Sequence, residues 1–197
     1  VRLETMFRQA YPDDKDPVTL SSLTKAIASF ERSLISFESP YDKYKYGRQP
    51  DAISAAAKSR EALFFGAELE CSHCHGGFTF TDNIQHRRLA FPEFGFHNTG
   101  LYNLDGKGGY PADNRGIRTF TEDASDEGKF RSPTLRNIAV TAPYMHDGSI
   151  ATLREVITGH YAVRGRAAAT SGQPSPLRDS LIVGFKVTEA DVDDLVA

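Results

Sequence analysis

The stretch "CSHCH" at residues 71–75 decides what kind of site this chain can build. It contains both cysteines of the chain, Cys71 and Cys74, with two residues between them and His75 directly after. A structural zinc site needs four ligands, usually with a second Cys or His pair at a similar spacing, and the sequence has no second pair. A thioredoxin-like dithiol requires a βαβ setting, which the flanking sequence lacks. C-x-x-C-H is instead the attachment signature of c-type haem.

This interpretation gives each residue of the motif a role. The thiols of Cys71 and Cys74 add to the porphyrin vinyl groups as thioethers, and their spacing places both on one helical turn. The adjacent His75 then donates an imidazole nitrogen to the iron as the proximal ligand. His73, between the cysteines, is expected at the surface. Because covalent haem attachment normally takes place outside the cytoplasm, we expect a periplasmic location.

The bulk composition is that of an ordinary globular protein. The chain has 197 residues, of which 40% are hydrophobic and 25% are charged. No apolar run approaches the roughly 20 residues that a membrane span needs. The formal net charge of -3 indicates neither a nucleic-acid-binding surface nor a polybasic membrane patch. The first residues, "VRLETMFRQAYPDD", show no signal peptide, and we expect the chain to be a piece of a longer protein.

Apolar spacing predicts four helical segments, at 19–37, at 51–69 just before CSHCH, at 152–161, and from 188 onward. The third begins with a T-x-x-E capping box formed by Thr152 and Glu155. No strand has a convincing alternation of apolar and polar residues.

The segment from residue 76 to about 130 lacks any sustained period and is rich in glycine, proline and scattered aromatics. A loop of this length is unusual in a compact domain unless it surrounds something other than protein. A porphyrin would account for it. The predicted fold class is therefore mainly α, a cytochrome c-like haem domain with long irregular loops.

A second axial ligand for the iron must come from outside the motif. The side chains that could supply it are histidines, a methionine and a tyrosine: Met145, His146, His160, Tyr161, His86 and His97. Met145 and His146 lie in a turn bracketed by proline and glycine, whereas His160 and Tyr161 lie near the end of the capped helix. Spacing alone leaves this choice open.

Four stretches resemble the bacterial di-haem cytochrome c peroxidase and MauG family. The most specific is "KFRSPTLRNIAVTAPYMHDGSIATLREVI" at 129–157, and "FHNTGLYNLDGKGGYP" at 96–111 is similar to the MauG-like branch in particular. "LTKAIASFERSLISFESPYDKY" at 23–44 resembles the close of the family's first haem domain. "ALFFGAELECSHCHGGFTFTD" at 62–82 resembles the opening of its second.

The resemblance implies a domain organisation. Family members carry two C-x-x-C-H haems, one per domain, and this chain has one. Residues 1–45 would be the C-terminal part of the first domain, and residues 46–197 would be the second haem domain. The haem bound here would be the six-coordinate one, which stores an electron or an oxidising equivalent. The peroxide site would lie outside this chain.

The resemblance also bears on the distal ligand. In the MauG branch a tyrosine follows the "HDG" turn by one helix length, commonly in "VIDHY". Here the sequence reads "VITGHY", one residue longer, so Tyr161 matches that tyrosine, with the extra residue at Thr158–Gly159. His160 and Met145 remain alternatives.

Further site residues follow from the resemblance alone. A calcium ion lies between the haems in the family, and the backbone carbonyls of Thr141 and Pro143 match two of its ligands. Arg136 would contact a haem propionate or fix its turn. MauG carries a tryptophan two residues before this motif, where the present chain has Leu69 and no tryptophan anywhere.

The predicted function is that of a di-haem MauG-like enzyme that uses hydrogen peroxide to oxidise a partner protein. A phenolate ligand would favour this MauG-like function, because it stabilises Fe(III) and higher oxidation states of the haem iron. The alternative is a di-haem cytochrome c peroxidase that takes electrons from a small electron-transfer protein. A further alternative is a mono-haem electron-transfer cytochrome without enzymatic activity.

Overall fold

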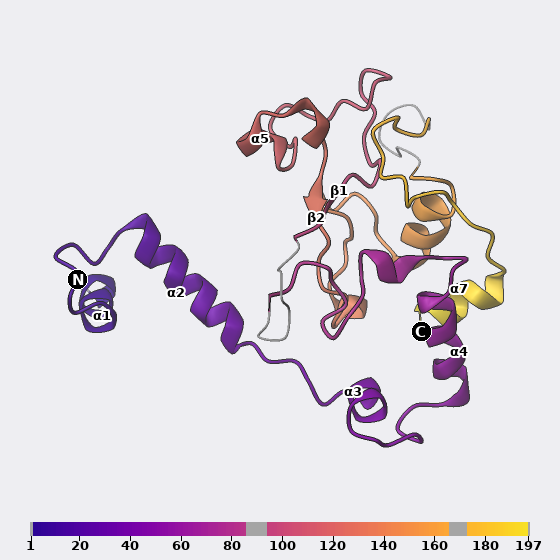
Figure 1. The fold of residues 1–197 in the computed structure, drawn as a ribbon, viewed down its shortest axis with the longest axis horizontal. Helices are drawn as coiled ribbons and strands as arrows, with labels where there is room; N and C mark the ends of the chain where they lie inside the picture. Colours follow the sequence, from indigo (N-terminus) through magenta and orange to yellow (C-terminus); the bar gives the residue numbers. More distant parts are fainter. Residues whose placement is uncertain (1, 86–93, 166–172, 197) are drawn as a thin grey trace. The chain divides into compact units, whose positions relative to one another are not determined.

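The computed structural model describes residues 2–85, 94–165 and 173–196. The chain forms two compact units, Val1–Ala52 and Ile53–Ala197. Both consist of helices and irregular segments with little sheet (Figure 1). Across the described residues, no helix combines the length and the apolarity that a membrane crossing requires. The predicted mainly α composition is confirmed.

The first unit consists of three helices, α1 (Arg2–Ala10), α2 (Leu20–Ser33) and α3 (Pro40–Lys45). Thr19 caps α2, and its hydroxyl accepts a hydrogen bond from the backbone of Ser22. The helix that we predicted to reach residue 37 ends at Ser33, whose hydroxyl donates to the carbonyl of Phe30 in place of a further helical turn. The predicted apolar face of α2 lies exposed.

The second unit contains the C-x-x-C-H motif. Its helical elements are α4 (Ala55–Phe65), η1 (Cys71–His73), α5 (Arg118–Thr121), η2 (Ala124–Asp126), η3 (Ile138–Val140), α6 (Leu153–Glu155), η4 (Val156–Tyr161) and α7 (Glu189–Val196). Helix α4 is shorter than the predicted 51–69 because Ser54 caps it and Gly66 follows its last residue. Two very short strands, β1 (Phe96–His97) and β2 (Phe130–Arg131), pair antiparallel. Strands of this length are too short for an alternating pattern to reveal them.

Helices from opposite ends of the second unit pack together. Helix α4 lies against η1 and α7, and α7 also contacts α6 (Figure 1). Arg60 on α4 donates to Asp194 on α7 over 3.3 Å, and Arg154 on α6 pairs with Glu189 and Asp193 on α7. Through α7, these contacts join the helix before the motif to the helical segment that ends at Tyr161.

Few apolar side chains are buried among the described residues of this unit: Leu69, Leu101, Tyr110, Ile150 and Val192. A purely protein core in a domain of this size buries many more. So small a number of buried apolar side chains is expected for a fold that surrounds a further apolar group.

Candidate haem site

The CSHCH motif forms a single tight turn. Glu70 adopts a left-handed conformation with a φ of 53°, and the 3₁₀ segment η1 begins at the next residue. The backbone amides of Cys74 and His75 both donate to the carbonyl of Cys71. The two thiols are not joined in a disulfide, and burial raises the pKa of Cys71 to about 11. Both thiols and the imidazole thus project from one turn, as attachment to one porphyrin requires.

His75 is oriented by two backbone carbonyls. Its Nδ1 lies 3.3 Å from the carbonyl oxygen of Phe80 and 3.2 Å from that of Pro133. A ring nitrogen that faces two acceptors carries the proton, so Nε2 keeps its lone pair. Burial, the largest effect, lowers the pKa of His75 and favours this neutral form. The geometry gives the tautomer that a metal-ligating histidine needs.

Tyr161 lies at the end of a π-helix. Segment α6 begins with the predicted capping box, in which Thr152 and Glu155 bond each other's backbone amides. It continues into η4, where the amide of Ala162 donates to the carbonyl of Ile157 over 2.8 Å. A π-turn is a helix with one inserted residue. The extra residue of "VITGHY" is therefore accommodated inside the helix.

The phenol of Tyr161 stays protonated in the absence of a metal. Burial raises the pKa of Tyr161 far above its ordinary value, and the Cys74 thiol, the Cys71 thiol and the phenol of Tyr110 add to the effect. The ring of His160, which is fully buried, lies edge-on to Tyr161 at a centroid distance of 5.0 Å.

The other candidate ligands come from other segments of the chain. Met145 and His146 belong to a loop closed by reciprocal backbone bonds between Tyr144 and Ile150. The imidazole of His146 stacks on Phe130 with ring centroids 3.8 Å apart. His86 lies outside the described residues.

His97 is engaged at both ring nitrogens. Nδ1 lies 2.8 Å from Asp179, and Nε2 lies 2.6 Å from Asp82. The side chain of Cys74, followed by the two carboxylates, raises the pKa of His97 to about 10 against the effect of burial. A histidine held as an imidazolium has no lone pair for a metal.

Arg136 lies across the loop that follows the motif. Its Nε and Nη2 donate to the carbonyl of Phe78 over 3.2 Å and 2.7 Å, and its guanidinium lies 5.3 Å from the centre of the Phe78 ring. These contacts join Arg136 to the loop after the motif, and the propionate contact stays a prediction. The predicted calcium ligands Thr141 and Pro143 lie exposed in the turn that follows η3.

The residues that are present fit a c-type haem. Two thiols share a turn with an imidazole whose Nε2 lone pair is available. The protein core around them is sparse.

Comparison with known proteins agrees with this geometry. The family model described as di-haem cytochrome c peroxidase matches residues 2–50. The methylamine utilization protein MauG of Methylorubrum extorquens is 31% identical over 194 residues, which cover 98% of this chain and 46% of that protein. Cytochrome c551 peroxidase of Pseudomonas aeruginosa is 30% identical over 191 residues, which cover 97% of this chain and 46% of that protein.

A solved structure agrees as well. A MauG-like protein associated with microbial copper homeostasis is 42% identical, with a TM-score of 0.80, over 100% of this chain and 57% of that protein. The chain belongs to the di-haem cytochrome c peroxidase and MauG family. It spans about half the length of the curated relatives that it matches.

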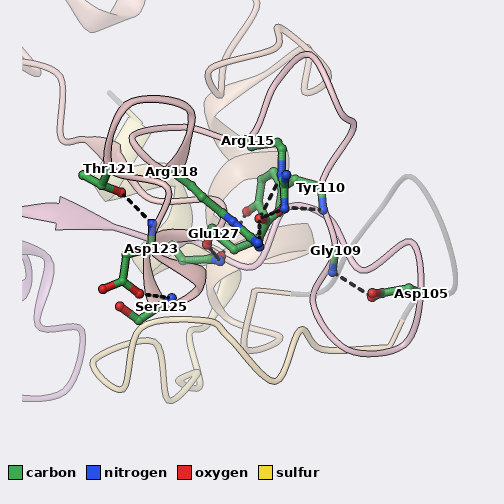
Figure 2. A network of polar contacts seen from close by, with 10 residues as sticks. Asp105, Gly109, Tyr110, Arg115, Arg118, Thr121, Asp123, Ser125 and Glu127 are labelled. Atoms are coloured by element: carbon green, nitrogen blue, oxygen red, sulfur yellow. Dashed lines mark hydrogen bonds and ion pairs between the residues drawn. The ribbon is translucent and has the colours of Figure 1, made fainter.

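In this member of the family, a buried carboxylate organises the loop between β1 and β2 (Figure 2). Glu127, only 4% exposed, accepts hydrogen bonds from Arg115 Nη2 over 2.7 Å and Arg118 Nη1 over 2.6 Å. Its other oxygen accepts the backbone amide of Tyr110 over 3.2 Å. Despite the opposing effect of burial, these donors hold the pKa of Glu127 below its ordinary value of 4.5.

Sequence reasoning missed both this network and the pairing of His97 with two aspartates. Glu127 lies 12 residues from Arg115 and 9 from Arg118, spacings that correspond to no regular element. His97 and Asp179 are 82 residues apart. The stretch 96–111, which includes His97, resembles the family, but the sequence contains no signal for the partners of His97.

Proposed function

We propose that this chain supplies the second haem domain of a di-haem, peroxide-dependent oxidoreductase of the MauG-like branch. Residues 46–197 would form that domain, and residues 1–45 would close the first. The coverage of about half of each relative supports this assignment, as does the family-model match at 2–50. The haem held here would be the six-coordinate one, one of two in the whole protein, in a periplasmic enzyme.

The ligand set is Cys71 and Cys74 as thioethers, His75 as the proximal ligand and Tyr161 as the distal ligand. The observation that carries the proposal is that Cys71, Cys74 and His75 share one tight turn in which two backbone carbonyls face Nδ1 of His75. Tyr161 is assigned by its match to the family's tyrosine, at the end of the helical segment that follows the HDG turn. His160 is the alternative on the same segment. Met145 is the alternative in the loop before α6.

These residues indicate what the site does to the iron that it binds. The carbonyls of Phe80 and Pro133 hold the Nδ1 proton of His75 and direct Nε2 to the metal. Burial opposes ionisation of the Tyr161 phenol, so the phenolate forms only when the charge of a metal compensates. A haem bound in this way supplies storage of an oxidising equivalent, because an anionic oxygen donor favours Fe(III) and higher states.

The activity would be oxidation of a partner protein at the expense of hydrogen peroxide, with peroxide reacting at the other haem, outside these residues. The peroxidase relatives support an alternative, in which a small electron-transfer protein supplies electrons for peroxide reduction. Rapid peroxide turnover with reduced cytochrome c would favour that alternative. Intact-mass analysis that finds a single haem in the full-length protein would leave only a mono-haem electron-transfer cytochrome.

Two further contacts belong to the proposal. Arg136 would reach a haem propionate while its turn-fixing bonds to Phe78 persist. The backbone carbonyls of Thr141 and Pro143 would bind calcium together with a ligand from outside this chain. Treatment with a calcium chelator should then lower the thermal stability of the full-length protein, and an unchanged melting temperature would argue against the site.

The distal ligand is tested by replacing Tyr161 with phenylalanine in the full-length, haem-loaded protein. Loss of the phenolate should convert one haem from low-spin to high-spin in its optical and EPR spectra. Tyr144→Phe is the matched control, because it also removes a phenolic hydroxyl, which donates to the carbonyl of Ile138. A low-spin spectrum that is unchanged in Tyr161→Phe would refute the assignment.

A further inference from the structure

A polar pocket lies beside the Glu127 network of the second unit (Figure 2). Its volume of about 270 Å³ is slightly below the range of about 300–1,000 Å³ that is usual for small-molecule pockets. Five charged side chains line it: Asp105, Lys107, Arg115, Arg118 and Glu127. The pocket therefore has the size for a small ion, and its charged groups decide which ion it accepts.

The two carboxylates of the pocket already have donors within the protein. Oδ1 of Asp105 accepts the backbone amides of Lys107 and Gly109, each over 2.8 Å. Glu127 accepts the guanidinium groups and the backbone amide described above, and it is almost fully buried. Neither carboxylate therefore needs a bound cation to satisfy it.

The guanidinium groups of Arg115 and Arg118 have N–H groups that Glu127 does not use. Arg115 donates Nε and Nη2 to Glu127, and Arg118 donates Nη1 to the same carboxylate. Among the residues that the structure describes, neither group donates to another acceptor, so Nη1 of Arg115 and Nε and Nη2 of Arg118 remain for a ligand. Both side chains are partly exposed, so a ligand can reach these donors.

The charges that line the pocket do not cancel. Lys107, Arg115 and Arg118 carry three positive charges at neutral pH, whereas Asp105 and Glu127 carry two negative ones, which leaves one positive charge in excess. Lys107 is exposed, so its ammonium group can move toward a ligand at little cost. The pocket thus favours an anion.

The arrangement of donors narrows the class of anion. A guanidinium group matches the spacing of the oxygens in carboxylates and phosphates. A simple carboxylate has two oxygens and can satisfy one guanidinium fork, whereas a tetrahedral oxoanion offers oxygens to two forks and an ammonium group together. Because Glu127 holds both arginines before the ligand arrives, binding costs less side-chain entropy than it would with two mobile arginines.

We propose that this pocket binds a small multivalent oxoanion of the phosphate type, held by Arg115, Arg118 and Lys107. The site is separate from the candidate haem ligands and does not depend on the peroxide chemistry. All three cationic residues belong to the loop between β1 and β2. A bound oxoanion would therefore join two parts of this loop that are separated in sequence and would reduce its local opening.

Hydrogen–deuterium exchange of the full-length, haem-loaded protein tests the site, with inorganic phosphate as the probe at constant ionic strength. Backbone amides of residues 105–118 should become more protected, and the protection should saturate as phosphate is added. The phosphate concentration at half-protection measures the affinity. Acetate, a monovalent carboxylate, should give no saturable protection under the same conditions. Protection by acetate at the same concentration as phosphate would overturn the assignment to a multivalent oxoanion.

Three variants locate the effect. Lys107→Gln removes one exposed charge and should raise the half-protection concentration about 3-fold. Arg118→Lys keeps a positive charge beside Glu127 but removes the guanidinium fork, and should raise this concentration about 10-fold. Lys186→Gln is the matched control, because Lys186 is an exposed lysine outside the pocket and its replacement changes the net charge equally. It should match the wild type.

Two results would overturn the proposal. One is the absence of saturable protection by phosphate in the wild type. The other is an equal half-protection concentration in Lys107→Gln and Lys186→Gln, which would show that phosphate acts elsewhere or by general screening. This comparison holds even where Arg118→Lys loosens the loop, because Lys107 is exposed and is not a partner of Glu127.

Discussion

Replacing Glu127 with glutamine should destabilise the second unit by an amount that the structure allows to be worked out. The carboxylate accepts from two guanidinium groups and one backbone amide while it is almost fully buried. Glutamine keeps one acceptor oxygen, but its amide group would face a guanidinium donor. Breaking one partner of a buried charged network costs about 3–5 kcal/mol.

The lower end of that range applies, because the side chains of Arg115 and Arg118 are 37% and 27% exposed and can be rehydrated. We therefore expect a loss of about 3 kcal/mol in the free energy of unfolding. For a protein of this size, this loss corresponds to a fall of about 6–12 °C in melting temperature.

The free energy of unfolding that Glu127→Gln removes should depend on pH, in a direction that the pKa of Glu127 determines. The pKa of Glu127 is lower in the folded protein than its ordinary value of 4.5. The stabilisation is therefore fully present above the unfolded pKa and is lost as the pH falls through the folded pKa. The gap between wild type and Glu127→Gln should be constant near neutral pH and should narrow on acidification below about pH 4.

Urea denaturation followed by far-UV circular dichroism, at neutral and at acidic pH, measures both quantities. Asp123→Asn is the control, because Asp123 is an exposed carboxylate in the same segment that accepts the amide of Ser125. Its substitution should leave the midpoint nearly unchanged. A midpoint for Glu127→Gln equal to that of Asp123→Asn would refute the reasoning, as would a gap that does not change on acidification.

Two further predictions concern backbone positions that hold the site in place. Gly128 has a φ of +68°, and a Cβ there would lie 2.1 Å from Cε2 of Tyr110. Gly128→Ala should therefore lower stability by more than about 2 kcal/mol in thermal melts, and a melting temperature equal to wild type would contradict this. Thr152→Ala removes the cap of the segment that carries Tyr161 and should cost about 1 kcal/mol. Thr152→Ser should restore most of the loss in urea titrations, and a failure to restore it would argue against the cap.

The helices could be predicted from the sequence because the signals for helix formation are local. The capping box at Thr152 formed as predicted, since it depends on residues three positions apart. The ends of the helices were harder to predict. The predicted end at residue 37 moved to Ser33, where a side chain bonds its own helix instead of extending it.

The two-stranded pairing of Phe96 and His97 with residues 130 and 131 was not foreseen. A strand of two residues has no period to detect, and its stability comes from a partner more than 30 residues away. The loop between these strands is ordered around Glu127, whose partners come from irregular segments with no spacing rule.

The sequence by itself indicated the motif proposed to anchor the haem, because Cys71, Cys74 and His75 follow one another within one turn. It also limited the candidates for a distal ligand to a few side chains. The tertiary structure decided the surroundings of these candidates. It places Tyr161 at the end of a π-helix, and it encloses His97 between two carboxylates. Both outcomes depend on contacts between segments distant in the chain, which no local pattern encodes.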